Sequence, residues 1–569
     1  MKSIKHFLIA GSLCCGAAAL LPSCSDLMDT DSEFVEFQED NKLQNSTDSV
    51  YSVMGIIYKM QTIADRTVLL GELRGDLTKT TASATSDLKA IGEFKIDVQN
   101  AYNRISDYYA IINNCNYFLA NVNKDLVKND RNVFESEYAV VKAFRAWTYL
   151  QVAQLYGKVP LITEPLLTEE ASQAAMNKTP TDLVGICNYF IDDIKPYVDT
   201  KLPTYGRINE QDSRKFFIPV RALLGDLCLW AGRYEEAAQY YHDYLALRTN
   251  PVRTGTSKAQ WNDYRTKEFR SAHNSFSFES SGNECLCYIP MEINEFYGIS
   301  SNLDNIFNST DINMRYAQVM PSKQMYVLSS KPDYCIADVK ADQSVDTIYA
   351  PKENLQDIKY AGDLRFGTVY DNYINTQERF SRISNERQSI DKFNSDGVTL
   401  YRVSMVYLRY AEALNRAGYP QSAFAVLKYG LYPTTVSKYI DEEERTAAAK
   451  LIGFDVDNFT EENTMGIHSR GCGWAECDTL YRLPEPLEPK ATRADTVNYQ
   501  IPLVEDMIVN EMALEGAFEG YRFFDLMRVA LRRGKPEYLA DPISLRNGEV
   551  DTNIRSLLMN TENWYLPKP

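Results

Sequence analysis

Two segments of this chain, 215–248 and 402–428, each read as a pair of amphipathic helices joined by a tight turn. In the first, Ala222–Leu227 precedes a turn at Gly232, and small residues recur just after it. In the second, apolar residues recur at helical spacing before the turn at Gly418–Pro420. Small residues let two helices approach closely, so each segment predicts an antiparallel helical hairpin.

Each hairpin is similar to one tetratricopeptide repeat, a unit that buries its apolar face only against neighbouring repeats. The two units are far apart in the chain, and most of 45–250 has helical periodicity. We therefore expect a mainly α fold, with helical repeats over about 45–250 and 402–430 forming an interrupted array in one domain over 45–569.

Two stretches separate these helical parts. Residues 250–400 are rich in Ser, Asn, Asp and Thr with short apolar runs, and 430–500 is also irregular. This composition predicts loops and short strands, and long insertions of this kind often carry function. A final helix is expected over about 503–532.

The N-terminus has the layout of an export signal. Lys2 and Lys5 precede an apolar run from Phe7 to Leu21, which is too short for an ordinary membrane span. The sequence Leu-Pro-Ser-Cys then ends at Cys24 and resembles a lipobox. It predicts a signal peptide over 1–23, lipid on Cys24 and a linker over 24–44; an ordinary secreted protein cleaved nearby is the alternative.

Charge and residue types exclude several functions. Removing 1–23 takes away two lysines and no acid, which changes the formal net charge from −17 to −19. Such an acidic chain does not favour nucleic acid, whose binding depends on Lys and Arg. The sequence has no Cys-x-x-Cys pair and only three histidines beyond the signal, so we expect no metal site and no cofactor.

Cys472 and Cys477 flank a glycine-rich loop that also contains Trp474. In an exported protein this spacing permits a disulfide. Two separate thiols are an equal alternative, because sequence alone does not fix the geometry that a disulfide needs.

Six stretches in order are similar to the SusD/RagB family, across almost the whole chain. They are Leu21–Cys24, Gly71–Asp76, Ala143–Ala146 leading to Tyr156–Leu161, Gly362–Arg365, Tyr407–Asn415 and Phe518–Arg528. One departure is Gly516, where the family usually has leucine, which leaves the local helix packing open.

The resemblance implies a tetratricopeptide scaffold with an irregular ligand-binding face. It also implies a lipoprotein on the outer face of the outer membrane, and the acidic residues after Cys24 resemble an export tag for that face. Such proteins pass a glycan, an oligosaccharide or polysaccharide, to a SusC-like TonB-dependent transporter. The alternatives are an oligopeptide ligand, or a structural transporter subunit without ligand affinity.

Six residues are candidate ligand contacts. Trp261 and Trp474 are large aromatics in irregular polar segments, where they either stack on a sugar or anchor local packing. The resemblance suggests Tyr297 and Asp76 as further contacts, although Asp76 also suits a helix cap. Arg379 and Arg382 lie in a polar segment that either lines the same face or forms surface ion pairs.

An acidic stripe is the main reason to consider an enzyme. Glu511, Glu515 and Glu519 are spaced by four residues and Asp525 follows. Two carboxylates on opposite sides of a sugar can hydrolyse a glycosidic bond. However, Glu519 and Asp525 each have an arginine three residues later, with which they can pair on a helix. We therefore expect a binding protein rather than an enzyme.

Overall fold

The computed structural model describes most of the chain from residue 46 onward. The described ranges are 46–208, 210–247, 260–263, 268–270, 284–292, 298–308, 316–352, 355, 361–374, 386–390, 392–393, 397–474, 476–487 and 492–568. The signal, Cys24 and the linker lie outside them. No helix among these residues has both the length and the apolar character needed to cross a bilayer.

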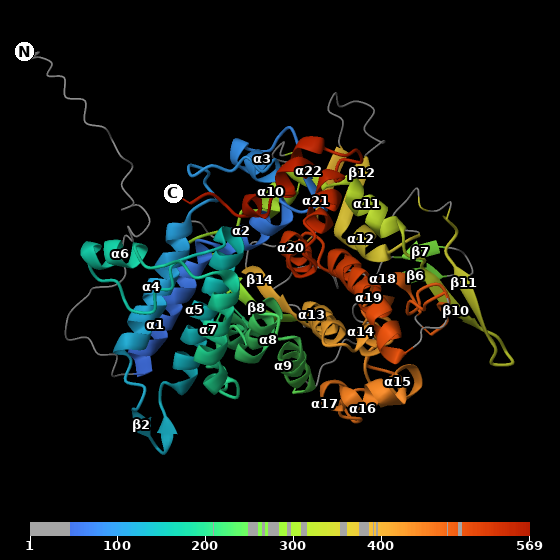
Figure 1. Ribbon diagram of the computed structural model, residues 1–569, viewed down its shortest axis with the longest axis horizontal. Helices are drawn as coiled ribbons and strands as arrows, with labels where there is room; N and C mark the ends of the chain where they lie inside the picture. The colour runs from blue at the N-terminus through green and yellow to red at the C-terminus, as the bar shows by residue number, and fades with distance from the viewer. Residues whose placement is uncertain are drawn as a thin grey trace, which may run out of the picture.

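The N-terminal half is an array of antiparallel helices, drawn in blue to green in Figure 1. From α4 to α9 each helix packs on the next, α1 packs on α4, and α2 lies against α20 (Arg522–Arg533) instead of α4. The array consists of α1 (Ser46–Gln61), α2 (Ala64–Glu72), α4 (Ile105–Asn121), α5 (Glu135–Tyr156), α7 (Leu183–Ile194), α8 (Val220–Trp230) and α9 (Tyr234–Ala246).

The α8–α9 hairpin shows why glycine is required in this unit. A Cβ atom on Gly225 would lie 2.5 Å from the Tyr241 ring, so any larger residue would push the two helices apart. The turn that follows α8 uses Gly232 with φ of +78°, a conformation that other residues rarely adopt. The predicted hairpin over 215–248 is confirmed.

The second predicted hairpin is α13 (Val403–Arg416) and α14 (Pro420–Lys428). Helix α13 packs against α9 and also against α19 (Arg493–Glu515), so segments far apart in sequence continue one helical array in space (Figure 1). The mainly α, tetratricopeptide-like architecture is therefore confirmed.

The single helix expected over 503–532 is wrong. The chain forms α19 and then α20 (Arg522–Arg533), separated by a turn in which Phe518 and Gly520 have φ of +70° and +87°. Gly516 ends α19, and a Cβ atom there would lie 2.9 Å from the Met512 carbonyl oxygen. The departure at Gly516 thus suits the tight end of this helix.

The remaining helices are short. They are α3 (Ser86–Gly92), α6 (Glu169–Met176), α10 (Leu303–Phe307), α11 (Lys323–Ser330), α12 (Leu364–Val369), α15 (Pro433–Tyr439), α16 (Glu442–Ala447), α17 (Ala449–Ile452), α18 (Ser469–Cys472), α21 (Glu537–Ser544) and α22 (Thr552–Leu558). Four of them, α15 to α18, give the 430–500 segment more helix than its sequence predicts.

The described strands form antiparallel pairs rather than a continuous sheet. The pairs are β1 (Thr78–Thr80) with β9 (Val319–Pro321), β2 (Val127–Lys128) with β3 (Arg131–Asn132), β4 (Arg207–Ile208) with β5 (Gln211–Asp212), β6 (Gln260–Asp263) with β7 (Glu268–Arg270), β8 (Cys285–Pro290) with β14 (Gly397–Arg402), β10 (Cys335–Val339) with β11 (Val345–Tyr349), and β12 (Tyr370–Ile374) with β13 (Glu386–Ile390).

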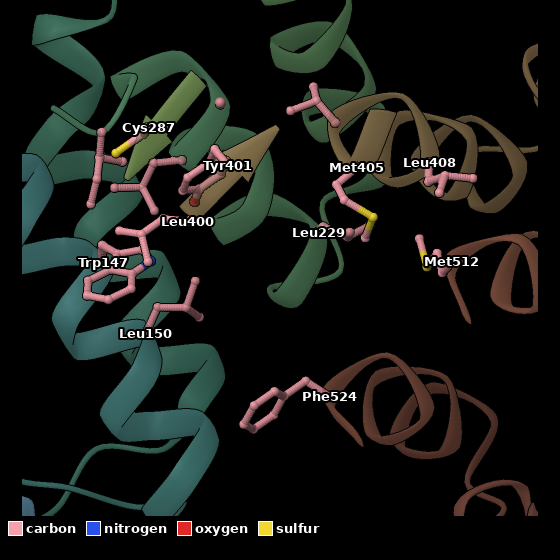
Figure 2. Close-up of a cluster of buried hydrophobic side chains, with 14 of the residues drawn as sticks. Trp147, Leu150, Leu229, Cys287, Leu400, Tyr401, Met405, Leu408, Met512 and Phe524 are labelled. Carbon is pink, nitrogen blue, oxygen red and sulfur yellow. The ribbon is translucent and has the colours of Figure 1, made fainter. Parts of the chain in front are cut away.

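A hydrophobic core joins the two helical halves. Figure 2 shows side chains from both halves turned toward the same interior. They include Trp147 and Leu150 of α5, Leu229 of α8, Cys287 of β8, Leu400 and Tyr401 of β14, Met405 and Leu408 of α13, Met512 of α19 and Phe524 of α20.

The acidic stripe, which runs from Glu511 and Glu515 of α19 to Glu519 in the turn after it, is buried and paired with cations. Glu515 accepts from Arg365 at 3.0 Å and from Arg402 at 2.7 Å. Arg365 also pairs with Glu511 at 2.7 Å, and Glu519 pairs with Arg402 at 2.7 Å. We call this the ionic cluster, and it also contains Asp363, Lys392 and Arg470.

Of the two ion pairs expected at a spacing of three residues, Asp525–Arg528 forms, at 2.8 Å. The expected Glu519–Arg522 pair does not form, because the Glu519 carboxylate pairs with Arg402 in the ionic cluster instead. Burial by itself would raise the pKa of Glu511, but the charges of Arg365 and His468 lower it to about 2. This carboxylate is therefore held ionised and is not placed to protonate a sugar.

The Arg365→Met substitution should lower the free energy of unfolding by about 3–5 kcal/mol, because it removes one buried cation from Asp363, Glu511 and Glu515 together. Arg555→Met is the matched control, since the Arg555–Asp541 pair is 43% and 47% exposed and should contribute less than about 1 kcal/mol. Urea denaturation measures both. Equal losses in the two variants would contradict a dominant role for the cluster.

Acid stability should depend on Glu412. Burial would raise the pKa of this carboxyl, but Arg416 and Arg528 lower it from 4.5 to about 2. Its contribution, on the order of 3 kcal/mol, is complete above about pH 4.5 and is lost as the pH falls toward 2. Urea unfolding at a series of pH values should show a smaller loss over this window for Glu412→Gln than for the native chain.

Candidate functional site

The structure describes only some of the predicted contact residues. Tyr297, Arg379 and Arg382 lie outside the described residues. Trp261 lies on β6, where the backbone pairs with Phe269 of β7 and the side chain is not described. Asp76 and Trp474 are described in full: the Asp76 side chain is buried, whereas the Trp474 side chain is exposed.

Asp76 is not at a surface, which corrects its interpretation as a ligand contact. It is 0% exposed, and its two carboxylate oxygens accept from Arg522 Nε at 2.6 Å and Nη2 at 3.0 Å. The same contacts, rather than a helix cap, satisfy the side chain. Asp76 therefore ties the end of the 71–76 segment to α20.

The rest of the 71–76 segment has a similar structural role. Glu72 accepts from the backbone N–H groups of Phe518 and Gly520 at 3.2 and 3.1 Å. Its burial raises its pKa to about 8 despite these bonds. Arg74 donates to the carbonyl oxygen of Trp564 at 2.8 Å and covers the ring of Phe523. The segment fastens the turn before α20 and the C-terminal residues.

Trp474 is 51% exposed, whereas Trp147 and Trp564 are 4% and 0% exposed. It follows α18, and its backbone N–H donates to the carbonyl oxygen of Cys335 on β10 at 3.0 Å. The preceding Gly473 has φ of +92°, and a Cβ atom there would lie 1.8 Å from the same oxygen. A large flat ring is thus presented to solvent from a firmly held backbone.

Of the two alternatives for Cys472 and Cys477, the structure has the two separate thiols. Cys472 is buried in α18 and its Sγ donates to Asp363 at 3.2 Å. Cys477 lies beyond the turn at Gly473, and its Sγ donates to the carbonyl oxygen of Trp474 at 3.4 Å. The glycine turn directs the two thiols to different surroundings.

A second aromatic group lies beside the Trp474 loop. Glu476 accepts from the Tyr439 hydroxyl at 3.1 Å and from Lys438 Nζ at 3.3 Å. Tyr439 in turn stacks on Tyr429, with ring centroids 3.7 Å apart and planes 2° from parallel. Glu476 therefore connects the loop that carries Trp474 to the end of α15.

A hollow of about 710 Å³ adjoins α15. Its lining is mostly polar: Gln421, Ser437, Lys438, Tyr439, Ile440, Asp441, Arg445, Leu483, Glu485, Pro486, Thr496 and Gln500. Gln500 is buried, its Nε2 donates to the Pro484 carbonyl oxygen, and its Oε1 has no partner among the described residues. We call Trp474, Glu476 and this hollow the Trp474 surface.

A larger cavity of about 970 Å³ lies between the α8–α9 turn, α20 and the C-terminal residues. Its aromatic walls include Trp230 and Tyr234. The guanidinium group of Arg528 lies 5.3 Å from the Trp230 ring centroid, and that of Arg416 lies 5.3 Å from Tyr234. One face of each ring is already covered by a cation, so this cavity suits the stacking of a ligand less well.

Sequence reasoning found Trp474 but missed Tyr439, Glu476 and Gln500. The criterion that selected Trp474, a large aromatic in an irregular polar segment, also applies to Tyr439 in 430–500. Gln500 offers no such signal, because only the fold brings its helix beside α15.

The arrangement is suited to binding rather than to group transfer. Trp474 offers an exposed apolar ring, while Lys438, Glu476 and Asp441 offer charged hydrogen-bonding groups beside it. The Tyr439 ring is itself covered, because Tyr429 stacks on it and Lys438 Nζ lies 4.7 Å from its centroid. Among the described residues, no group of three or more His, Cys, Asp and Glu side chains is placed to hold a metal ion.

Comparison with known proteins relates the chain by structure rather than by sequence. No protein-family model and no curated protein matches it. A SusD superfamily protein from Bacteroides vulgatus is similar, with a TM-score of 0.56, 12% identity and coverage of 92% of this chain and 95% of the other.

Two more solved structures are similar over most of their length. A SusD-like protein from Bacteroides fragilis has a TM-score of 0.53, 16% identity and coverage of 87% and 88%. A SusD-like carbohydrate-binding protein from Bacteroides vulgatus has a TM-score of 0.51, 15% identity and coverage of 85% and 83%. With its helical array and its interrupting strand pairs, this chain has a SusD-like fold.

Proposed function

We propose that this protein is a cell-surface receptor that binds a glycan at the Trp474 surface. The exposed Trp474 ring carries the proposal, because it presents a large flat apolar face to solvent from a backbone that β10 holds in place. The C–H faces of a sugar ring are apolar and flat, so they match an indole face, while the hydroxyl groups seek polar partners around it.

The surrounding groups support a sugar over a purely apolar ligand. Glu476 and Asp441 accept hydrogen bonds and Lys438 donates them. The Oε1 of Gln500, which has no partner in the described part of the chain, is one more acceptor beside the hollow. A carboxylate accepts from two neighbouring hydroxyls at once, which is a common requirement for a sugar. One of the similar structures is a carbohydrate-binding protein, which favours the same ligand class.

Delivery to a transporter completes the proposal. A lipid on Cys24 would hold the protein at the outer face of the outer membrane, beside a SusC-like TonB-dependent transporter that receives the glycan. Two acyl chains give the stable attachment that such a role needs. The acidic net charge does not favour nucleic acid as a partner. Oligopeptide binding and a structural role without ligand affinity remain the competing functions that binding experiments separate.

The Trp474→Ala substitution should weaken glycan binding about tenfold. Covering roughly 50 Å² of apolar ring at about 25 cal/mol per Å² contributes about 1.3 kcal/mol. Isothermal calorimetry against a panel of polysaccharides and oligopeptides measures the effect on the full mature chain. Tyr439→Ala should weaken binding in the same direction, because it removes the neighbouring ring and the hydroxyl that holds Glu476.

Tyr189→Ala is the matched control, since Tyr189 is an exposed aromatic on α7 and should leave the affinity unchanged. Binding of oligopeptides with no binding of any glycan would overturn the proposal. Glycan binding that is equally strong in the Trp474→Ala and Tyr189→Ala variants would move the ligand to another surface.

The Cys24→Ala substitution should release the protein from the membrane fraction while its glycan affinity stays the same, because the lipid and the folded body are separate. Cell fractionation and surface proteolysis measure the location. Cys15→Ala is the control, since Cys15 would be removed with the signal and should leave the protein attached. A Cys24→Ala protein that stays at the surface would place the anchor elsewhere.

A further inference from the structure

Two cysteines from distant parts of the chain meet beneath Trp474. Cys335 begins β10 and Cys477 lies in the loop after α18. The Sγ atoms of both lie within hydrogen-bond distance of one acceptor, the carbonyl oxygen of Trp474, at 3.5 and 3.4 Å. Because a thiol carries a single hydrogen, Cys335 donates either to this oxygen or to Cys477 Sγ.

The backbone on each side of this pair is already fixed. The Trp474 N–H donates to the Cys335 carbonyl oxygen at 3.0 Å, and Gly473 pairs with Cys335 as an isolated bridge. On the other side, Thr347 of β11 donates its hydroxyl to the Cys477 carbonyl oxygen at 2.7 Å. Both cysteines are thus held on one well-fixed loop with their sulfur atoms around the same oxygen, which is the kind of proximity that a disulfide requires.

Reactivity favours Cys477 as the attacking thiol. Among the cysteines that the structure describes, it alone is not fully buried. The hydrogen bond from Cys335 lowers the pKa of Cys477 to about 7, against the opposing effect of burial. A thiol with a pKa near the ambient pH is close to the optimum for thiol–disulfide exchange.

We propose that Cys335 and Cys477 form a disulfide that locks the Trp474 loop to β10. The Cys477 thiolate attacks one sulfur of an external protein or small-molecule disulfide and releases one thiol of the oxidant. The Cys335 thiol then gives up its proton and attacks Cys477 Sγ, which breaks the mixed disulfide. Two electrons and two protons pass from the cysteines to the oxidant, which leaves as two thiols.

The bond would form outside the cytoplasm and directly beneath Trp474, and both facts suggest what it does. An exported chain meets the oxidising conditions in which disulfides persist. The bond would cross-link the two sides of the loop that presents Trp474, so that the ring needs less ordering when a ligand arrives. The oxidising compartment and this second part both rest on the proposed function, whereas the capacity of the two thiols to form the bond does not.

The full mature chain tests the bond directly. It is equilibrated with oxidised glutathione or with dithiothreitol, its free thiols are alkylated in denaturant, and its peptides are identified by mass spectrometry without reduction. We expect a linked Cys335–Cys477 peptide only in the oxidised sample, with Cys472 alkylated in both. Cys472→Ser should keep the link, and Cys335→Ser should leave Cys477 alkylated.

A Cys472–Cys477 link, or complete alkylation of Cys477 after oxidation, would overturn the proposal. Calorimetry then tests the role of the bond: the oxidised protein should bind glycan several-fold more tightly than the reduced protein, and Cys477→Ser should bind equally in both conditions. A linked protein with unchanged affinity would overturn the locking role alone. A linked protein that binds no glycan would overturn the proposed function and leave the disulfide in place.

Discussion

The burial of three glutamates, two at the end of α19 and Glu519 in the turn after it, is the constraint on which the rest of the structure depends. A carboxylate in the protein interior is costly unless cations and hydrogen bonds surround it. Glu515 alone contacts Arg365, Arg402 and Arg470, which come from three segments far apart in sequence. These segments must converge on α19 before its charges are satisfied. The same pairing explains why an acidic stripe that resembles a catalytic feature belongs to the scaffold.

Several of the stretches that carry the family resemblance contain residues that hold this scaffold together. Asp76 pairs with Arg522, Arg365 enters the ionic cluster, and Glu412 pairs with Arg528 at the centre of the fold. Periodicity therefore predicted the helical pairs, and the ordered stretches predicted the architecture. Neither could predict the break between α19 and α20, because it depends on Glu72 capturing backbone N–H groups 446 and 448 residues away.

The site was harder to predict than the fold for a physical reason. Trp474 was visible in the sequence as an aromatic without an apolar helix around it. Its neighbours were not, because Tyr439 reaches the loop through Glu476 and Gln500 reaches the hollow through the packing of α19 near α15. The thiol pair shows the same limit. The spacing in the sequence suggested Cys472 as the partner of Cys477, whereas the fold places Cys335 beside Cys477.

The ionic cluster also supports the surface that we propose for ligand binding. Arg470 lies in α18 and pairs with both Glu284 and Glu515, while Cys472 donates to Asp363 inside the same cluster. The chain leaves this anchor through Gly473 and immediately exposes Trp474. One end of the loop is thus held by buried charge, and the other end meets β10 and β11. Because both ends of the loop are held, Trp474 loses little conformational entropy when a ligand binds. More of the free energy of its contact with the ligand therefore contributes to affinity.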